Sequence, residues 1–175
     1  QLLQRAAAVN RQSPLLATLA SGRPTLVAGS TWPADEAELL PAFAKVHARH
    51  SDLRLIIATH ESNDEHFDPV IRWASDAKLR LARVDAEDAG VADVVLVDRF
   101  GVLGDLYALA DAAFVGGGFH LAGLHSVLEP AAFGAPVLFG PHHTRSRDAL
   151  ALLRENGAVA VSDSAAIERT LLDWF

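Results

Sequence analysis

The residues best suited to hold a charged ligand lie between Ala112 and Pro141. Three consecutive glycines, Gly116 to Gly118, follow a short apolar run. Glycine has no Cβ, so backbone N–H groups in such a loop can approach a ligand closely. A glycine loop at the carboxyl end of a strand, facing a helix N-terminus, is where open α/β sheets bind anions and nucleotides. The alternative is a tight strand-to-helix turn that binds nothing.

A carboxylate follows the glycine loop at Glu129, and His120, His125 and Ser126 lie between the two. An ionised carboxylate only accepts hydrogen bonds, which suits the vicinal hydroxyls of a sugar. With Gly117 and Gly118 at a phosphate, this set of residues fits a nucleotide sugar. The alternative for Glu129 is a charge that stabilises the first turn of a helix through the helix dipole.

A second loop with hydroxyl groups is predicted at Ser30 and Thr31. These residues follow the apolar run 25–30 and precede Pro33, which suits the first position of a helix. If the run is a buried parallel strand, both hydroxyls lie at the same sheet edge as the glycines. The alternative is that one of the two residues only caps the helix.

Other common sites are not indicated by the sequence. Leu121 stands where a dinucleotide-binding G-x-G-x-x-G motif needs its third glycine. No G-K-[ST], H-E-x-x-H or G-x-S-x-G motif occurs, which argues against a P-loop, a zincin and a serine hydrolase. The histidine pairs His47/His50 and His142/His143 lack an evident third ligand, so we predict no metal site.

The elements that position these residues alternate between short apolar runs and amphipathic stretches. We expect strands at 25–30, 53–59, 79–84, 94–97, 112–115, 136–139 and 158–161, with helices between them and a last helix capped by Ser162 or Ser164. This pattern predicts an α/β fold, a Rossmann-like and mostly parallel sheet with helices on both faces. Residues 1–22, with a possible helix at Gln1–Asn10, are expected to form an interdomain linker or leading helix, and residues 23–175 one domain.

Composition narrows the functional classes. The chain has 175 residues, half of them hydrophobic, no cysteine and a net charge of −7. It therefore has no disulfide or cysteine-ligated metal, and the charge argues against nucleic acid as a partner. No apolar run approaches the ~20 residues that span a bilayer. The chain contains no Met and begins at Gln1, so we expect a piece of a longer protein.

Three segments resemble the 3-deoxy-D-manno-octulosonic acid (Kdo) transferases of lipopolysaccharide assembly. That family has GST-H, D-x-x-G-E-L and GG…GGHN-x-LEPA-x-FG-x-PV-x-FGP motifs. The corresponding segments here are Gly29–Trp32, Asp98–Leu103 and Gly116–Pro141, and the strongest match is LEPAAFGAPVLFGP from Leu128 to Pro141. The resemblance extends from about Arg23 to the end of the chain.

The resemblance implies the C-terminal half of a GT-B glycosyltransferase, the half that holds the nucleotide-sugar donor, here CMP-Kdo or a similar compound. It implies that the catalytic carboxylate and the lipid A-type acceptor site lie in a missing N-terminal domain. This half would contain no catalytic residue and need no metal or cofactor, and alone it would be inactive. The full enzyme would act at the cytoplasmic side of the bacterial inner membrane, with this domain soluble. The expected substrate-binding residues are Ser30, Thr31, Gly117, Gly118, His125, Ser126 and Glu129.

The chain departs from the family pattern at several positions. Trp32 replaces the His of GST-H, Val102 replaces the Glu of G-E-L, and Ser126 replaces the Asn of GGHN. The loop after the second strand also lacks the arginines of the family's R-H-P-E-R-F segment. Two alternatives therefore stay open: another GT-B-like enzyme, such as a UDP-sugar transferase or epimerase, and a non-catalytic nucleotide- or sugar-binding module.

Overall fold

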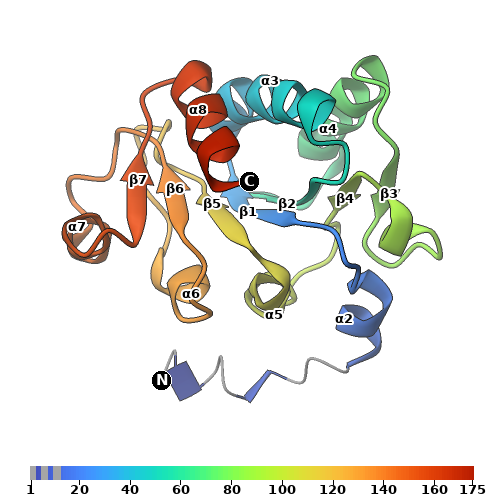
Figure 1. Ribbon diagram of the computed structural model, residues 1–175, viewed down its shortest axis with the longest axis horizontal. Helices are drawn as coiled ribbons and strands as arrows, with labels where there is room; N and C mark the ends of the chain where they lie inside the picture. Colours follow the sequence, from blue (N-terminus) through green and yellow to red (C-terminus); the bar gives the residue numbers. More distant parts are fainter. Residues whose placement is uncertain (1–2, 5–7, 10–12) are drawn as a thin grey trace.

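A computed structural model describes residues 3, 4, 8, 9 and 13–175 (Figure 1). The strands are β1 (Thr25–Thr31), β2 (Arg54–Thr59), β3 (Leu81–Arg83), β4 (Val94–Leu96), β5 (Ala112–Val115), β6 (Val137–Phe139) and β7 (Ala158–Ala160). The α-helices are α2 (Pro14–Leu19), α3 (Pro33–Arg49), α4 (Asp64–Asp76), α5 (Leu103–Leu106), α6 (Leu128–Ala131), α7 (Arg147–Arg154) and α8 (Ser164–Trp174). Two short 3₁₀ helices are η1 (Ala89–Val91) and η2 (Tyr107–Leu109).

The described strands form one parallel sheet with the order β3-β4-β2-β1-β5-β6-β7. The prediction that 25–28, 54–58, 94–97, 112–115 and 137–139 are adjacent parallel strands is confirmed. The strands β2, β3 and β4 lie on one side of β1, and β5, β6 and β7 lie on the other. Strands β2 to β4 are therefore added on one side of β1, and strands from β5 onward on the other side. The position between β1 and β5 is a topological switch point, and sheets of this kind bind ligands there.

Helices cover both faces of the sheet, as the sequence predicts (Figure 1). Side chains alternate between the faces along each strand, so Leu26 and Ala28 pack against α3, α4 and α8, while Val27 packs against α2, α5 and η2. The central strands β2 and β5 are buried along their whole length. Burial on both faces explains why these strands are continuous apolar runs rather than alternating ones.

A short helix lies within residues 1–22, the segment expected to be an interdomain linker or leading helix, and that expectation stays a prediction. Pro14 occupies the first turn of α2, and the Ser13 Oγ accepts a hydrogen bond from the Leu16 amide at 3.3 Å, which caps the helix. Leu16 and Leu19 are buried in the core beneath the sheet. The helix α2 therefore packs on the domain. The possible helix at 1–10 lies largely outside the described residues.

The expected cap of the last helix is wrong. Asp163 caps α8, with its Oδ1 accepting from the Ala166 amide at 2.8 Å, because Ser164 is already the first helical residue. The helix α6, which contains Glu129, has only four residues. Gly134 still ends this segment, with φ of +78°, a left-handed conformation that favours glycine.

We predict that Leu16→Ala and Leu19→Ala each lower the free energy of unfolding by about 2–5 kcal/mol, because each leaves a cavity in the core. Urea unfolding followed by circular dichroism measures this difference. The matched control is Thr18→Ala, an exposed position on the same helix, which should change stability by no more than about 0.5 kcal/mol. Wild-type stability in the two leucine variants would show that α2 is not part of the folded unit.

Candidate functional site

The Asp35 carboxylate joins the start of α3 to the glycine loop. Its Oδ2 accepts hydrogen bonds from the Trp32 and Gly117 amides, both at 2.8 Å, and its Oδ1 accepts from the Phe119 amide at 3.0 Å. The side chain is completely buried. Such charge-assisted bonds are stronger than neutral ones, and an acidic group in the first turn also suits the helix dipole. Asp35 therefore fixes how the loops after β1 and β5 meet at the switch point.

The glycine loop is packed too closely for any side chain. A Cβ on Gly116 would lie 2.1 Å from the Ser30 carbonyl oxygen, and one on Gly118 would lie 2.4 Å from the Gly140 amide nitrogen. Gly117 has φ of +93°. All three glycines are buried, and the Gly117 amide already donates to Asp35. The structure gives these glycines a packing role, and the predicted ligand contacts of Gly117 and Gly118 stay predictions.

Ser30 and Thr31 belong to the end of β1 rather than to the loop after it. Ser30 has φ of 55° and lies where the register with β2 shifts. Thr31 is fully buried, and its hydroxyl donates to Glu36 Oε1 at 2.8 Å. Neither residue caps α3, because Trp32 takes the N-cap position. A ligand contact by Thr31 stays a prediction that would need its bond to Glu36 to break.

Three rings from three loops form a parallel column above the switch point. Trp32 lies between His60 and His120, with ring centroids 3.9 Å apart on each side and interplanar angles of 17° and 9°. The Trp32 Nε1–H donates to His125 Nε2 at 3.3 Å, and His125 lies 5.0 Å from His60. Stacking at this separation contributes to stability beyond area burial. The column therefore holds the loops after β1, β2 and β5 together.

His125 must be neutral for this arrangement. Burial lowers the pKa of His125, the charge of His60 lowers it further, and Asp35 acts in the opposite direction. The lowered pKa keeps Nε2 unprotonated and able to accept the Trp32 N–H. Protonation would turn the acceptor into a second donor and remove this hydrogen bond.

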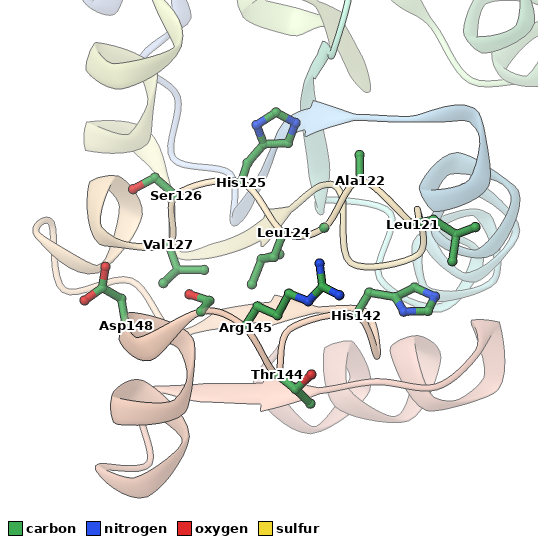
Figure 2. A pocket seen from close by; sticks show the side chains of 12 residues that line it. Leu121, Ala122, Leu124, His125, Ser126, Val127, His142, Thr144, Arg145 and Asp148 are labelled. Atoms are coloured by element: carbon green, nitrogen blue, oxygen red, sulfur yellow. The ribbon is translucent and has the colours of Figure 1, made fainter.

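A pocket of about 550 Å³ opens beside this cluster, between the loops 121–127 and 142–148 (Figure 2). The predicted residues His125 and Ser126 line it, whereas Ser30, Thr31, Gly117, Gly118 and Glu129 are not among its lining residues. This pocket therefore brings together only two of the seven expected substrate-binding residues.

Glu129 does not line this pocket and lies near Tyr107 instead. Burial raises the pKa of Tyr107, and the charge of Glu129 raises it further, so the two side chains are near one another. The Tyr107 hydroxyl lies against Gly29, where a Cβ would be 2.0 Å from it. Glu129 is thus placed beneath the end of β1, and its contact with a ligand stays a prediction.

Arg145 and Asp148 line the pocket with His142, and neither is among the residues expected from the sequence. All three belong to the segment after β6, at the same edge of the sheet as the glycine loop. The position of this segment directly after a predicted strand was a signal for it, because the loops that follow parallel strands converge at one edge of the sheet. The sequence alone could not show which of these loops lie next to each other.

No group of three or more His, Asp or Glu side chains among the described residues is arranged to hold a metal ion. No described helix combines the length and the apolar character needed to cross a membrane.

Comparisons with known proteins give one consistent result. No protein-family model matches the chain. It is 34% identical over 134 residues to the 3-deoxy-D-manno-octulosonic acid transferase of Aquifex aeolicus and 33% identical over 159 residues to that of Bordetella pertussis, covering 76% and 89% of this chain. In both cases the chain spans only 36% of the relative's length.

A solved structure with a similar fold is the C-terminal CMP-Kdo binding domain of WaaA from Acinetobacter baumannii. The TM-score is 0.75 with 24% identity, over 99% of this chain and 86% of that chain. At this identity the likeness shows the fold alone. The predicted fold class, one Rossmann-like half of a GT-B glycosyltransferase, is confirmed.

We predict that Asp35→Asn lowers the free energy of unfolding by about 2–4 kcal/mol, because an amide cannot accept on both sides and its NH₂ would face a backbone N–H. Urea unfolding measures the change. Asp64→Asn, an exposed acid in the first turn of α4, is the matched control for the loss of helix-dipole charge. If both variants lose equal stability, the three loop bonds of Asp35 contribute nothing beyond the dipole.

We also predict a pH dependence from Glu36. Burial raises its pKa from the ordinary 4.5 to about 7, against the lowering effect of the Thr31 hydroxyl and with a further increase from the Asp35 charge. Between these two values the folded chain holds a proton that the unfolded chain has lost. Glu36 therefore lowers stability as the pH rises from 4.5 to about 7, by about 3 kcal/mol in total, with no further change above that range.

The variant Glu36→Gln, which stays neutral, isolates this effect. Its stability relative to wild type should increase across that pH window, as measured by urea unfolding at several pH values. Glu65→Gln, at an exposed position, should differ from wild type by the same amount throughout. A Glu36→Gln difference that does not vary with pH would contradict the raised pKa.

Proposed function

Because the chain belongs to the 3-deoxy-D-manno-octulosonic acid transferase family, we propose that it is the donor-binding domain of such an enzyme and binds CMP-Kdo or a similar nucleotide sugar. One observation carries the proposal: the segment Gly116–Pro141, which contains the family motif, closes against Trp32 and Asp35 at the topological switch point of the sheet. Open α/β sheets bind nucleotides at this place.

The pocket beside the switch point supports this proposal. It is about 550 Å³, within the range of small-molecule sites, and it contains hydroxyl, imidazole and guanidinium groups together with apolar side chains. His125 and Ser126 are positioned there by the hydrogen bond from Trp32 and by the His125 amide, which donates to the Gly116 carbonyl at 3.0 Å. Preorganised groups of this kind reduce the ordering cost of binding.

We propose that a second domain, outside this chain, contains the residues that carry out the chemical step. The chain spans about a third of its relatives' length, and we propose that the remainder supplies the acceptor site for a lipid A precursor and the base that activates its hydroxyl. The acceptor oxygen would attack the anomeric carbon of the sugar, and the nucleotide would leave with the electron pair of the broken bond. This reaction needs no metal or other cofactor from this half, and we place the full enzyme at the cytoplasmic side of the bacterial inner membrane.

The roles proposed for the individual residues follow from their positions. Ser30, His125 and Ser126 would donate to the phosphate or the sugar, and Glu129 would accept from ribose hydroxyls. Gly117, Gly118 and Thr31 would contribute only if ligand binding rearranges the loop, because their present bonds and burial keep them from solvent.

We predict that the isolated chain binds CMP with a dissociation constant of about 0.1–1 mM, because a half-site covers one side of the ligand only. UMP should bind more weakly, and no sugar should be transferred. Glu129→Gln should weaken CMP binding by about 1–3 kcal/mol through the loss of charged hydrogen bonds. Isothermal titration calorimetry with both nucleotides measures these differences.

The control variant is Glu87→Gln, an exposed acid in the loop after β3 at the far edge of the sheet. It should bind CMP as the wild type does. A preference for UMP would favour a UDP-sugar enzyme, and binding of neither nucleotide would contradict the proposal. Unchanged CMP binding by Glu129→Gln would remove Glu129 from the site.

A further inference from the structure

A second cavity lies at the edge of the sheet opposite the switch point. It has a volume of about 700 Å³ and is formed where β1, β2 and β5 begin, by residues of the segments 20–25, 50–54 and 108–111 together with Trp174 and Phe175. The described strands are all parallel, so this cavity and the pocket beside the glycine loop lie at opposite ends of the strands. The proposed donor site therefore leaves this cavity unused.

Arg54, the first residue of β2, is a buried charge in the wall of this cavity. The residue is 1% exposed, and its Nε donates to the Thr25 hydroxyl oxygen at 2.7 Å. Neither Nη1 nor Nη2 has a hydrogen-bond partner among the described residues, and Nη1 is itself buried. Most buried polar atoms in folded proteins have a partner, and a guanidinium stays charged. Arg54 therefore lacks the acceptor that a buried guanidinium needs.

The neighbouring charges do not supply that acceptor. Burial lowers the pKa of Arg54, the charge of Arg23 lowers it further, and Asp111 acts in the opposite direction. Asp111 is exposed, forms no ion pair with Arg54, and uses its Oδ2 to accept from the Thr25 amide at 2.8 Å. Arg23 is paired with Asp93 at 2.9 Å. Of the two arginines that line this cavity, Arg54 is thus the one without an acidic partner.

Apolar side chains make up much of the remaining lining. Leu109, Trp174 and Phe175 are half-buried there and offer aliphatic and aromatic surface. A ligand that suits both parts of the cavity combines one acidic group with an apolar body. Asp52 and Asp111 also line the cavity, so a doubly charged phosphate is repelled more strongly than a single carboxylate.

We propose that this cavity is a second binding site, which receives a small monocarboxylic acid with an aromatic or aliphatic body. The carboxylate would accept from the Arg54 guanidinium, whose two-point geometry matches it. The guanidinium is held by one hydrogen bond, so a small rotation would bring Nη1 to the ligand. The apolar body would lie against Leu109 and Trp174. Because the donor site is at the other end of the strands, the two ligands should bind independently.

The test is titration of the isotope-labelled chain with 3-phenylpropionate, followed by NMR chemical shifts. Shifts should occur in the segments 20–25, 50–54 and 108–111, and not in the loops 121–127 and 142–148. Two comparison compounds separate the ring from the charge: 3-phenylpropanol has the ring alone, and inorganic phosphate has the charge alone. Each should bind at least about tenfold more weakly than the acid. Saturation with CMP should leave the affinity for the acid within about twofold.

A carboxylate beside a ring also occurs in proteins, as an acidic side chain next to an aromatic one. The blocked dipeptide N-acetyl-glutamyl-phenylalanine amide presents this pair on a backbone. It should bind more weakly than the free acid, because its amide groups would lose water at the apolar part of the lining without gaining partners.

Arg54→Met replaces the charge by an apolar side chain. Its urea midpoint should equal or exceed that of the wild type, because an apolar residue in place of a buried charge is often neutral or stabilising. Its affinity for 3-phenylpropionate should fall by about tenfold or more. Arg54→Lys, which keeps the charge but offers no fork, should show a smaller loss. The matched control is Arg72→Met, at an exposed position on α4 outside the cavity, which should bind as the wild type does.

Several results would contradict the second site. In the wild type these are no shifts up to about 10 mM acid, or shifts confined to the loops 121–127 and 142–148. Equal affinity of Arg54→Met and the wild type would remove Arg54 from the site. Equal binding of 3-phenylpropanol would show recognition of the ring alone, and tighter binding of the dipeptide would assign the cavity to a protein segment. Binding of the acid without binding of CMP would support this site and contradict the proposed donor site, and the opposite result would do the reverse.

Discussion

The buried carboxylate of Asp35 is the interaction on which the site edge depends. Three backbone amides, from Trp32, Gly117 and Phe119, donate to it, which offsets the cost of removing the charge from water. These bonds bring the glycine loop against the end of β1, at a distance that permits no Cβ on Gly116. The glycines are therefore required by packing in this structure, whether or not a phosphate binds nearby.

The aromatic column extends this constraint to a third loop. Trp32 and His120 are positioned by segments that Asp35 holds, and His60 adds the loop after β2. The loop after β6 is attached differently, through the His142 amide, which donates to the Gly118 carbonyl at 2.7 Å. The pocket thus opens between two parts of the site edge. One part is the loops after β1, β2 and β5, which are joined by several contacts, and the other is the loop after β6, which is attached by fewer contacts. Such a site can admit a ligand without disturbing the Asp35 bonds.

The charge distribution agrees with a half-site. The chain is acidic, with a net charge of −7, yet Arg145 and His142 lie together on one wall of the pocket. A local positive group on an acidic protein suits a small anion, whereas the overall negative charge disfavours contact with the phosphate backbone of nucleic acids. The chain matches only 36% of the length of these two relatives, so the remainder of such an enzyme has room to cover the other side of the donor in the proposed function.

The sequence by itself determined the strands, their parallel arrangement and the family, because buried parallel strands are short apolar runs and the 128–141 motif is local. It did not determine α2, whose burial depends on a distant contact with η1 and the sheet. The tertiary structure alone decided that Asp35 binds the glycine loop and that Trp32 stacks between two histidines. It also decided that the Thr31 hydroxyl is bound to Glu36 and that Arg145, Ser126 and Asp148 line one pocket. These contacts join residues from separate loops, and only the order of strands in the sheet brings those loops together.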